Sequence, residues 1–162
     1  MKKLYFPMFV DISKKKIIVV GGGSIASRRV QTLLAFAEDI LVVSPEVTEE
    51  IHALYEEGMV RWVRSVYCPD VLDGAQIVLA ATDDPECNEQ VVKDCHLRGI
   101  QVNAAHRKEL CDFYFPAIAS GDTVVAGITT SGRNHRQARM AREAIERAIE
   151  RLERKDMDGE NV

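Results

Sequence analysis

A chain of 162 residues has the length of one compact domain with, at most, a small appendage. Its composition, 46% hydrophobic and 28% charged, is typical of a globular protein with a substantial core and excludes a disordered or fibrous chain. No apolar run approaches the length of a membrane span, so we expect no contact with a membrane. The net charge of −4 argues against a nucleic-acid-binding protein.

The apolar run from Leu4 to Val10 is interpreted as a first strand of the mature protein. It is too short for a signal peptide and lacks a small-residue cleavage site. The four cysteines form no Cys-x-x-Cys pair, so no metal site is predicted. Free, mostly buried thiols in a reducing cytoplasm are expected instead, and we predict a cytoplasmic protein.

The next hundred residues alternate between strand-like and helix-like segments. Apolar runs predict five strands, of which those at 16–20 and 40–43 are expected to be buried, and apolar residues at helical spacing predict three helices. In chain order these are a strand at 16–20, a helix at 24–36, strands at 40–43 and 60–63 around a helix at 48–57, a strand at 77–81, a helix at 85–98 and a strand at 101–103. Such alternation predicts the α/β class, with a Rossmann-type parallel sheet covered by helices on both faces.

The pattern changes after residue 110. Two strand-like runs at 113–118 and 123–128 flank a hairpin-like turn, and a long helix with an apolar stripe follows at 136–155. We therefore predict a nucleotide-binding-type Rossmann domain at 1–110, a hairpin-and-helix dimerisation region at 111–155 and a disordered tail at 156–162. A hairpin and one helix cannot form a core of their own, so the exposed stripe favours a homodimer.

A glycine-rich turn follows the first of the alternating strands. Residues 21–26 fit the dinucleotide fingerprint G-x-G-x-x-G/A in the required place, after a strand and before a helix. Gly21 permits the tight turn, and Gly23 lets the backbone approach a pyrophosphate, with Gly22 between them. Ala26 keeps the helix close to the sheet, and free N–H groups at the helix start attract phosphates. We predict a dinucleotide cofactor here.

Two strand ends complete the predicted cofactor site. Glu46 follows Ser44 and Pro45 at the end of the second strand, where its carboxylate could accept a hydrogen bond from the adenosine ribose or merely cap the next helix. Arg and Lys are absent between residues 44 and 50, which disfavours a 2′-phosphate and favours NAD over NADP. Beyond the fourth strand, Ala81 and Thr82 lie where ligands bind in open parallel sheets. Asp84 is interpreted as the cap of the helix that starts at Pro85.

At this point the sequence resembles the precorrin-2 dehydrogenase family, the amino-terminal part of siroheme synthase. The resemblance extends over nearly the whole chain at matching spacing, in the stretches Phe6-Pro7-Met8-Phe9-Val10-Asp11, Val19-Val20-Gly21-Gly22-Gly23, Ala80-Ala81-Thr82-Asp83-Asp84 with Asn88, Val102-Asn103, residues 113–116, and Thr130-Ser131-Gly132 leading into Ala138-Arg139.

The resemblance implies NAD-dependent oxidation of precorrin-2 to sirohydrochlorin in siroheme biosynthesis, by a homodimer. It also implies that the dinucleotide lies against Ser24, Ile25, Pro45 and Glu46. Some members insert iron as ferrochelatases. The catalytic carboxylate of the family is the Asp of an Asn-x-x-Asp motif, and here that motif reads Asn103-Ala104-Ala105-His106.

His106 is therefore our candidate catalytic residue, because an imidazole can accept a proton at neutral pH. The alternatives are that His106 is an ordinary solvated side chain, and that the chain binds tetrapyrrole or NAD without turnover or inserts metal as a sirohydrochlorin ferrochelatase. Asp112 is a weaker candidate because the following strand directs it elsewhere. No metal site is predicted from the spacing of the histidines.

The substrate that the resemblance implies, precorrin-2, is a polycarboxylate, and the chain has one basic segment. Residues 130–155 hold eight Arg or Lys against four Glu. Arginine forks match carboxylates bidentately, although i,i+4 ion pairs on a solvated face would explain the same residues. The predicted substrate-binding residues are Asn103, Thr130, Ser131, Gly132, Arg133, Arg136 and Arg139. For Arg28 and Arg29 on the first helix, solvated surface charge is the default expectation.

Overall fold

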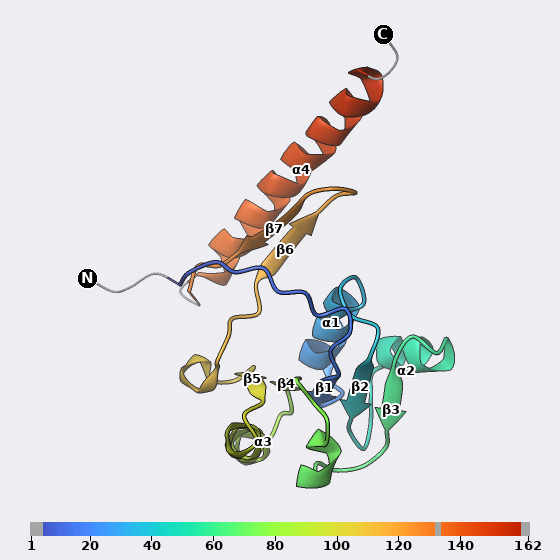
Figure 1. The fold of residues 1–162 in the computed structure, drawn as a ribbon, viewed down its shortest axis with the longest axis vertical. Coiled ribbons are helices and arrows are strands. Elements are labelled where there is room, and N and C mark those ends of the chain that lie inside the picture. The colour runs from blue at the N-terminus through green and yellow to red at the C-terminus, as the bar shows by residue number, and fades with distance from the viewer. Residues whose placement is uncertain (1–4, 132–133, 160–162) are drawn as a thin grey trace, which may run out of the picture. The chain divides into compact units, whose positions relative to one another are not determined.

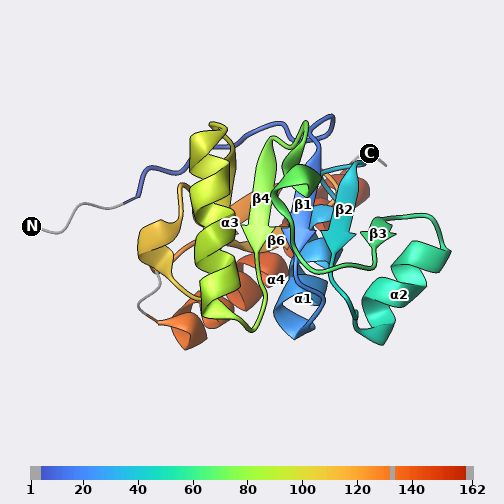
Figure 2. The ribbon, with the colours of Figure 1, turned by 90° about the horizontal axis from the view of Figure 1, so that it is seen from below.

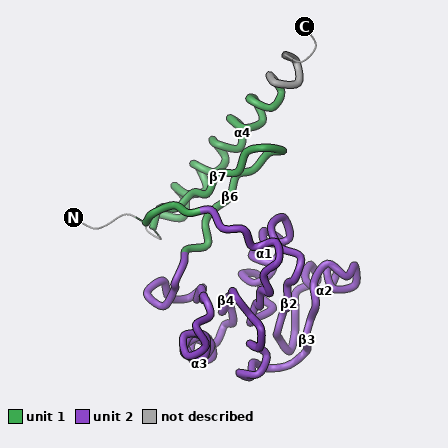
Figure 3. The backbone as a smooth tube through the Cα atoms, in the orientation of Figure 1, with its two compact units in different colours: residues 1–8, 114–162 green, residues 9–113 purple. Residues whose placement is uncertain are grey.

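A computed structural model describes residues 5–131 and 134–159 of the chain (Figure 1). The chain divides into two compact units, shown separately in Figure 3. The sheet unit comprises residues 9–113, and the hairpin unit comprises, among the described residues, 5–8, 114–131 and 134–159. The cofactor-binding residues predicted from the sequence all belong to the sheet unit.

The sheet unit contains five parallel strands in the order β3-β2-β1-β4-β5. They span Ile17–Val20 (β1), Ile40–Val43 (β2), Arg61–Val63 (β3), Ile77–Ala80 (β4) and Gln101–Ala104 (β5). Every residue of β1 and β2 is buried, as expected for β-branched runs covered on both faces of a parallel sheet. The strand order reverses direction at β1, so the carboxyl ends of β1 and β4 flank the place where this fold binds ligands.

Three α-helices cover the sheet, with α1 and α2 on one face and α3 on the other (Figures 1 and 2). They span Ser24–Leu33 (α1), Glu49–Glu56 (α2) and Pro85–Leu97 (α3). Two short 3-10 helices, Pro69–Leu72 and Lys108–Leu110, lie in the connections. The caps are those that the sequence predicts, because Thr48 accepts a hydrogen bond from the Ile51 amide and Asp84 from the Glu86 amide.

The hairpin unit consists of strands β6 (Ala117–Ser120) and β7 (Val125–Ile128), which pair antiparallel, and the helix α4 (His135–Gly159). Helix α4 packs along both strands, burying Ala119 and Ile149. At the hairpin turn the Glu153 carboxylate accepts a hydrogen bond from the Thr123 amide, at 3.2 Å. The expected fold class is confirmed, since the sheet, the hairpin and the long helix are all present.

The expectations for the first strand, for the tail and for the burial of the cysteines need correction. The expected first strand is absent from the described part of the segment, residues 5–10, which pairs with no strand and leaves Phe6, Met8 and Phe9 exposed. Pro7 there has no N–H to donate to a sheet. Residues 5–8 also group with the hairpin unit, through contact of the Tyr5 and Tyr114 rings.

The expected disordered tail from residue 156 is wrong for 156–159, because α4 continues to Gly159, and 160–162 lie outside the described residues. The four cysteines are free, as expected, but Cys68 is exposed and only Cys95 is buried. In the described part of the chain, no helix is both long and apolar enough to span a membrane.

Candidate dinucleotide site and the end of strand β5

The three glycines after β1 have three different environments. Gly21 has a φ of +119°, and a Cβ there would overlap the Ala81 carbonyl. A Cβ on Gly22 would overlap the Glu46 carbonyl oxygen. A Cβ on Gly23 would meet no atom within 4 Å. Gly21 and Gly22 are thus required by the chain's own packing, whereas the space at Gly23 is left open.

The open space at Gly23 lies at the start of helix α1. Gly23 is the N-cap residue, no side chain caps the helix, and its first turn contains no acidic residue. Ala26 is fully buried, so the helix lies close to the sheet. An uncapped helix N-terminus beside a missing Cβ fits a pyrophosphate, because backbone N–H groups and the helix dipole both favour an anion.

The β2–α2 loop, residues 44–48, has its backbone held by side chains. Trp62 Nε1 donates to the Ser44 carbonyl at 2.9 Å, and Arg64 Nε donates to the Pro45 carbonyl at 3.2 Å. Ser44 Oγ donates to the Glu46 carbonyl at 2.6 Å. Three successive carbonyls therefore each accept a side-chain hydrogen bond, which preorganises the loop where the ribose of a dinucleotide would bind.

At the end of β4, Thr82 is fixed by the buried side chain of Asn88. Asn88 Oδ1 accepts from the Thr82 amide at 3.0 Å, and Asn88 Nδ2 donates to the Thr82 carbonyl at 3.0 Å. The Thr82 hydroxyl lies 2.9 Å from both Asn88 Oδ1 and the Asp84 carbonyl. The Ala81 amide donates to the Val20 carbonyl, at 2.8 Å. The small side chain of Ala81 and the fixed Thr82 backbone leave this strand end close to Gly21.

Asn103 on β5 is buried, and its side-chain amide has partners on both sides. Its Oδ1 accepts from Arg29 Nη1 at 2.6 Å, and its Nδ2 donates to the Phe113 carbonyl at 2.7 Å. Burial lowers the pKa of the Arg29 guanidinium from its ordinary value. Arg29 is therefore a partly buried residue that links α1 to β5, and the expectation of a solvated surface charge is wrong for it.

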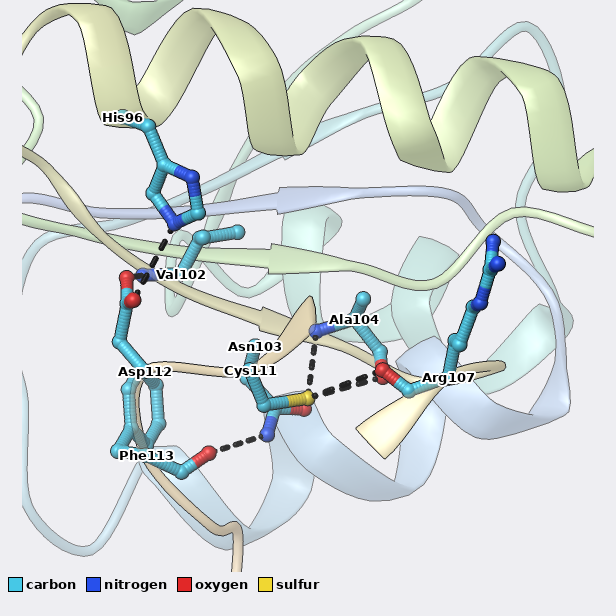
Figure 4. Close-up of polar contacts among 8 residues, drawn as sticks. All are labelled: His96, Val102, Asn103, Ala104, Arg107, Cys111, Asp112 and Phe113. Atoms are coloured by element: carbon cyan, nitrogen blue, oxygen red, sulfur yellow. Dashed lines mark hydrogen bonds and ion pairs between the residues drawn. The ribbon is translucent and has the colours of Figure 1, made fainter. Parts of the chain in front are cut away.

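The segment after β5 turns back along the strand, and its side chains bond to the strand's backbone (Figure 4). Asp112 Oδ2 accepts from the Val102 amide at 2.9 Å, while Asp112 Oδ1 lies 3.2 Å from His96 Nε2. Cys111 Sγ donates to the Ala104 carbonyl and accepts from the Ala104 amide, both at 3.2 Å. Burial raises the pKa of the Cys111 thiol, which keeps it protonated as a donor. Both carboxylate oxygens of Asp112 therefore have partners within the sheet unit.

His106 lies in the exposed turn between β5 and the 3-10 helix that starts at Lys108. The neighbouring Glu89 carboxylate forms an ion pair with Arg107, which lowers the pKa of Glu89, and His106 adds a smaller effect of the same sign. The imidazole is thus at the carboxyl end of a parallel strand and open to solvent, where it can contact a bound molecule. No group of three His, Cys, Asp or Glu side chains suited to a metal ion is found among residues 5–131 and 134–159.

The remaining predicted substrate residues lie in the hairpin unit. The Thr130 hydroxyl bonds with the backbone of Asn134, and Ser131 has a φ of +56° in the same turn. Arg136 and Arg139 are exposed on the first turns of α4, and Arg139 lies 3.7 Å from Glu143. Gly132 and Arg133 lie outside the described residues. The i,i+4 pair of Arg142 with Glu146 forms at 2.6 Å.

Comparison with known proteins identifies the family to which the chain belongs. A family model described as "Putative NAD(P)-binding" matches residues 8–117, which include the glycine turn, both flanking strand ends and His106. The chain belongs to this NAD(P)-binding family. The match confirms the predicted dinucleotide cofactor.

The most similar relatives agree with the resemblance seen in the sequence. The chain is 40% identical over 141 residues to a "Probable multifunctional siroheme biosynthesis protein HemA" of Ruminiclostridium josui, covering 86% of this chain and 27% of that protein. It is 35% identical over 144 residues to "Siroheme synthase" of Psychrobacter sp., covering 89% and 30%. The chain thus spans less than a third of the length of these curated relatives.

Among solved structures, "SirC, precorrin-2 dehydrogenase" matches 89% of this chain and 71% of its own, with a TM-score of 0.74 and 26% sequence identity. The similarity covers the parallel sheet and extends beyond it, which confirms the fold class. The resemblance to the precorrin-2 dehydrogenase family is likewise confirmed by these matches.

Sequence reasoning missed the roles of Arg29, Trp62 and Arg64. Each acts on a segment distant along the chain, so no local motif marks it. The available signal was that Trp62 is the single tryptophan of the chain and stands two residues before Arg64 at the end of a short strand. Period-two alternation places Trp62 and Arg64 on one side of that strand and Arg61 on the other.

Proposed function

We propose that this chain catalyses the NAD-dependent oxidation of precorrin-2 to sirohydrochlorin, a step of siroheme biosynthesis, in the cytoplasm. The observation that carries the proposal is the open space at Gly23, at the uncapped start of α1, together with an exposed imidazole at the end of β5 in the same sheet unit. The similarity to siroheme synthases and to a precorrin-2 dehydrogenase supports precorrin-2 as the substrate.

In this reaction, separate residues of the chain would bind NAD, accept the proton and bind the substrate. Backbone N–H groups at the start of α1 bind the pyrophosphate, and the β2–α2 loop binds the adenosine ribose, with Glu46 accepting from a ribose hydroxyl. When bound, NAD supplies the two-electron oxidation. His106 accepts the proton that the tetrapyrrole loses, at a ring nitrogen. In the hairpin unit, Arg136 and Arg139 remain the candidates for binding substrate carboxylates.

The direct test is incubation of the full chain with precorrin-2 and NAD, with NADH followed by absorbance and the product by its spectrum. We expect stoichiometric NADH and sirohydrochlorin. Binding of precorrin-2 without NADH formation would establish a non-catalytic binding protein instead. Insertion of Fe²⁺ into added sirohydrochlorin without NAD would indicate a ferrochelatase. Absence of NADH above a blank, at saturating NAD, would overturn the proposal.

We further infer a homodimer formed through the hairpin unit. Val124 and Val125 at the hairpin, and Met140 and Leu152 on α4, are exposed apolar side chains. A contiguous partner surface would remove them from water. Sedimentation velocity at micromolar concentration should give twice the chain mass, and Leu152→Glu should lower it toward the mass of one chain. A monomer in the wild type would contradict the inference.

A further inference from the structure

The guanidinium of Arg64 contacts the β2–α2 loop from the neighbouring strand end. Arg64, directly after β3, is exposed, and its Nε donates to the Pro45 carbonyl at 3.2 Å. Its Cζ lies 5.8 Å from the centre of the Trp62 ring. Among the described residues, no carboxylate lies within 4 Å of this guanidinium. A positive charge therefore lies beside the β2–α2 loop with no neutralising carboxylate in the described part of the chain.

The hydrogen bond to the Pro45 carbonyl leaves the outer part of the Arg64 guanidinium available to bind a ligand. The contact to Pro45 uses Nε, so the two terminal nitrogens remain as a fork that can bind an anion with two parallel hydrogen bonds. The carbonyl contact and the Trp62 ring restrict the side chain, which reduces the entropy lost on binding. A lysine at this position would lack both the planar fork and the Nε anchor.

In open α/β sheets the adenosine ribose lies beyond the carboxyl end of the second strand, which here is the β2–α2 loop. The 2′-phosphate is the chemical group that distinguishes NADP from NAD at this ribose. We propose that Arg64 is a specificity-determining residue that binds the 2′-phosphate, so that the site takes NADP as well as NAD. This inference rests on the dinucleotide site of the proposed function.

Glu46 opposes Arg64 in this selection. Its side chain is exposed on the same loop, where a carboxylate accepts a hydrogen bond from a 2′-hydroxyl but repels a 2′-phosphate. The ratio of the two affinities is thus set by one acidic and one basic residue. NAD was favoured over NADP because residues 44–50 contain no Arg or Lys, whereas the basic residue lies directly after strand β3.

The test is calorimetric titration of the full chain with NADH and with NADPH. We expect the wild type to bind both. Arg64→Ala should weaken NADPH binding by about 10- to 100-fold, the range of a charge-assisted contact, and NADH binding by less than about threefold. Arg64→Lys should fall between, and Glu46→Gln should shift the preference toward NADPH. Fluorescence of Trp62, the single tryptophan, is a second readout in the same titrations.

Arg61→Ala is the matched control. Arg61 is an arginine of the same strand, but it forms an ion pair with Asp39, so its removal should leave both affinities unchanged. A wild type that binds NADH but not NADPH, or an Arg64→Ala variant that loses both equally, would overturn the role of Arg64 and leave the proposed function standing. A wild type that binds neither dinucleotide would overturn both.

Discussion

Gly21→Ala is expected to destabilise the protein by about 3 kcal/mol. Gly23→Ala is expected to leave stability nearly unchanged and to weaken NADH binding at least about tenfold. Gly21 has a φ of +119°, and its Cβ would overlap the Ala81 carbonyl, so both strain and overlap oppose the substitution. At Gly23 the φ of −80° is ordinary and the Cβ would enter open space.

Two measurements separate the effects. Urea unfolding followed by circular dichroism gives the free energy of unfolding of each variant, and calorimetry gives the NADH dissociation constant. Gly23→Val extends the series, because a larger side chain at the same point should weaken binding further. Wild-type NADH affinity in both Gly23 variants would place the pyrophosphate elsewhere. Wild-type stability of Gly21→Ala would contradict the turn geometry.

Replacement of His106 by alanine should lower kcat for precorrin-2 oxidation by about 100-fold or more, the usual contribution of a general base. NADH affinity should change by less than about twofold, because the phosphate and ribose contacts lie at other strand ends. The measurement is steady-state NADH formation at saturating substrates, with NADH binding determined separately. His96→Gln is the control, since it keeps a hydrogen-bond donor toward Asp112 and should leave kcat unchanged.

His106→Asp gives a sharper result than loss of activity alone. This substitution restores the family's Asn-x-x-Asp pattern, so activity should return toward the wild-type value. A carboxylate at this position can accept the same proton, so kcat of the aspartate variant should lie well above that of the alanine variant. An alanine variant with undiminished kcat, or an aspartate variant no more active than the alanine variant, would remove His106 from the mechanism.

The sheet unit could be predicted from the sequence because its signals are local. Continuous β-branched runs identified β1 and β2, and Thr48 and Asp84 marked the starts of two helices by their capping chemistry. The segment at residues 5–10 is also largely apolar but forms no strand. A strand forms only beside a partner strand with free backbone groups, and the local sequence does not indicate whether such a partner exists.

The candidate site was predictable only in part, for a related reason. The roles of Gly21 and Gly23 follow from a motif in which backbone shape and ligand approach are encoded within six residues. Asn103 was predicted to bind substrate, yet both ends of its amide have partners in the chain, Arg29 and the Phe113 carbonyl. Such partners come from residues far away in sequence. A pattern can therefore identify the residue type at a site without showing what it contacts.

The side chains along β5 have one more consequence. Asp112 and Cys111 occupy the backbone groups of Val102 and Ala104 that a neighbouring strand would otherwise use. The outer edge of β5 is thereby closed to strand addition from a second molecule, which is a route to aggregation. Asp112→Ala together with Cys111→Ala would free the Val102 amide and the backbone groups of Ala104, while the Asp112 amide would still donate to the Val102 carbonyl. The five-stranded sheet thus ends at β5 through chemistry that also protects it from uncontrolled edge-to-edge growth.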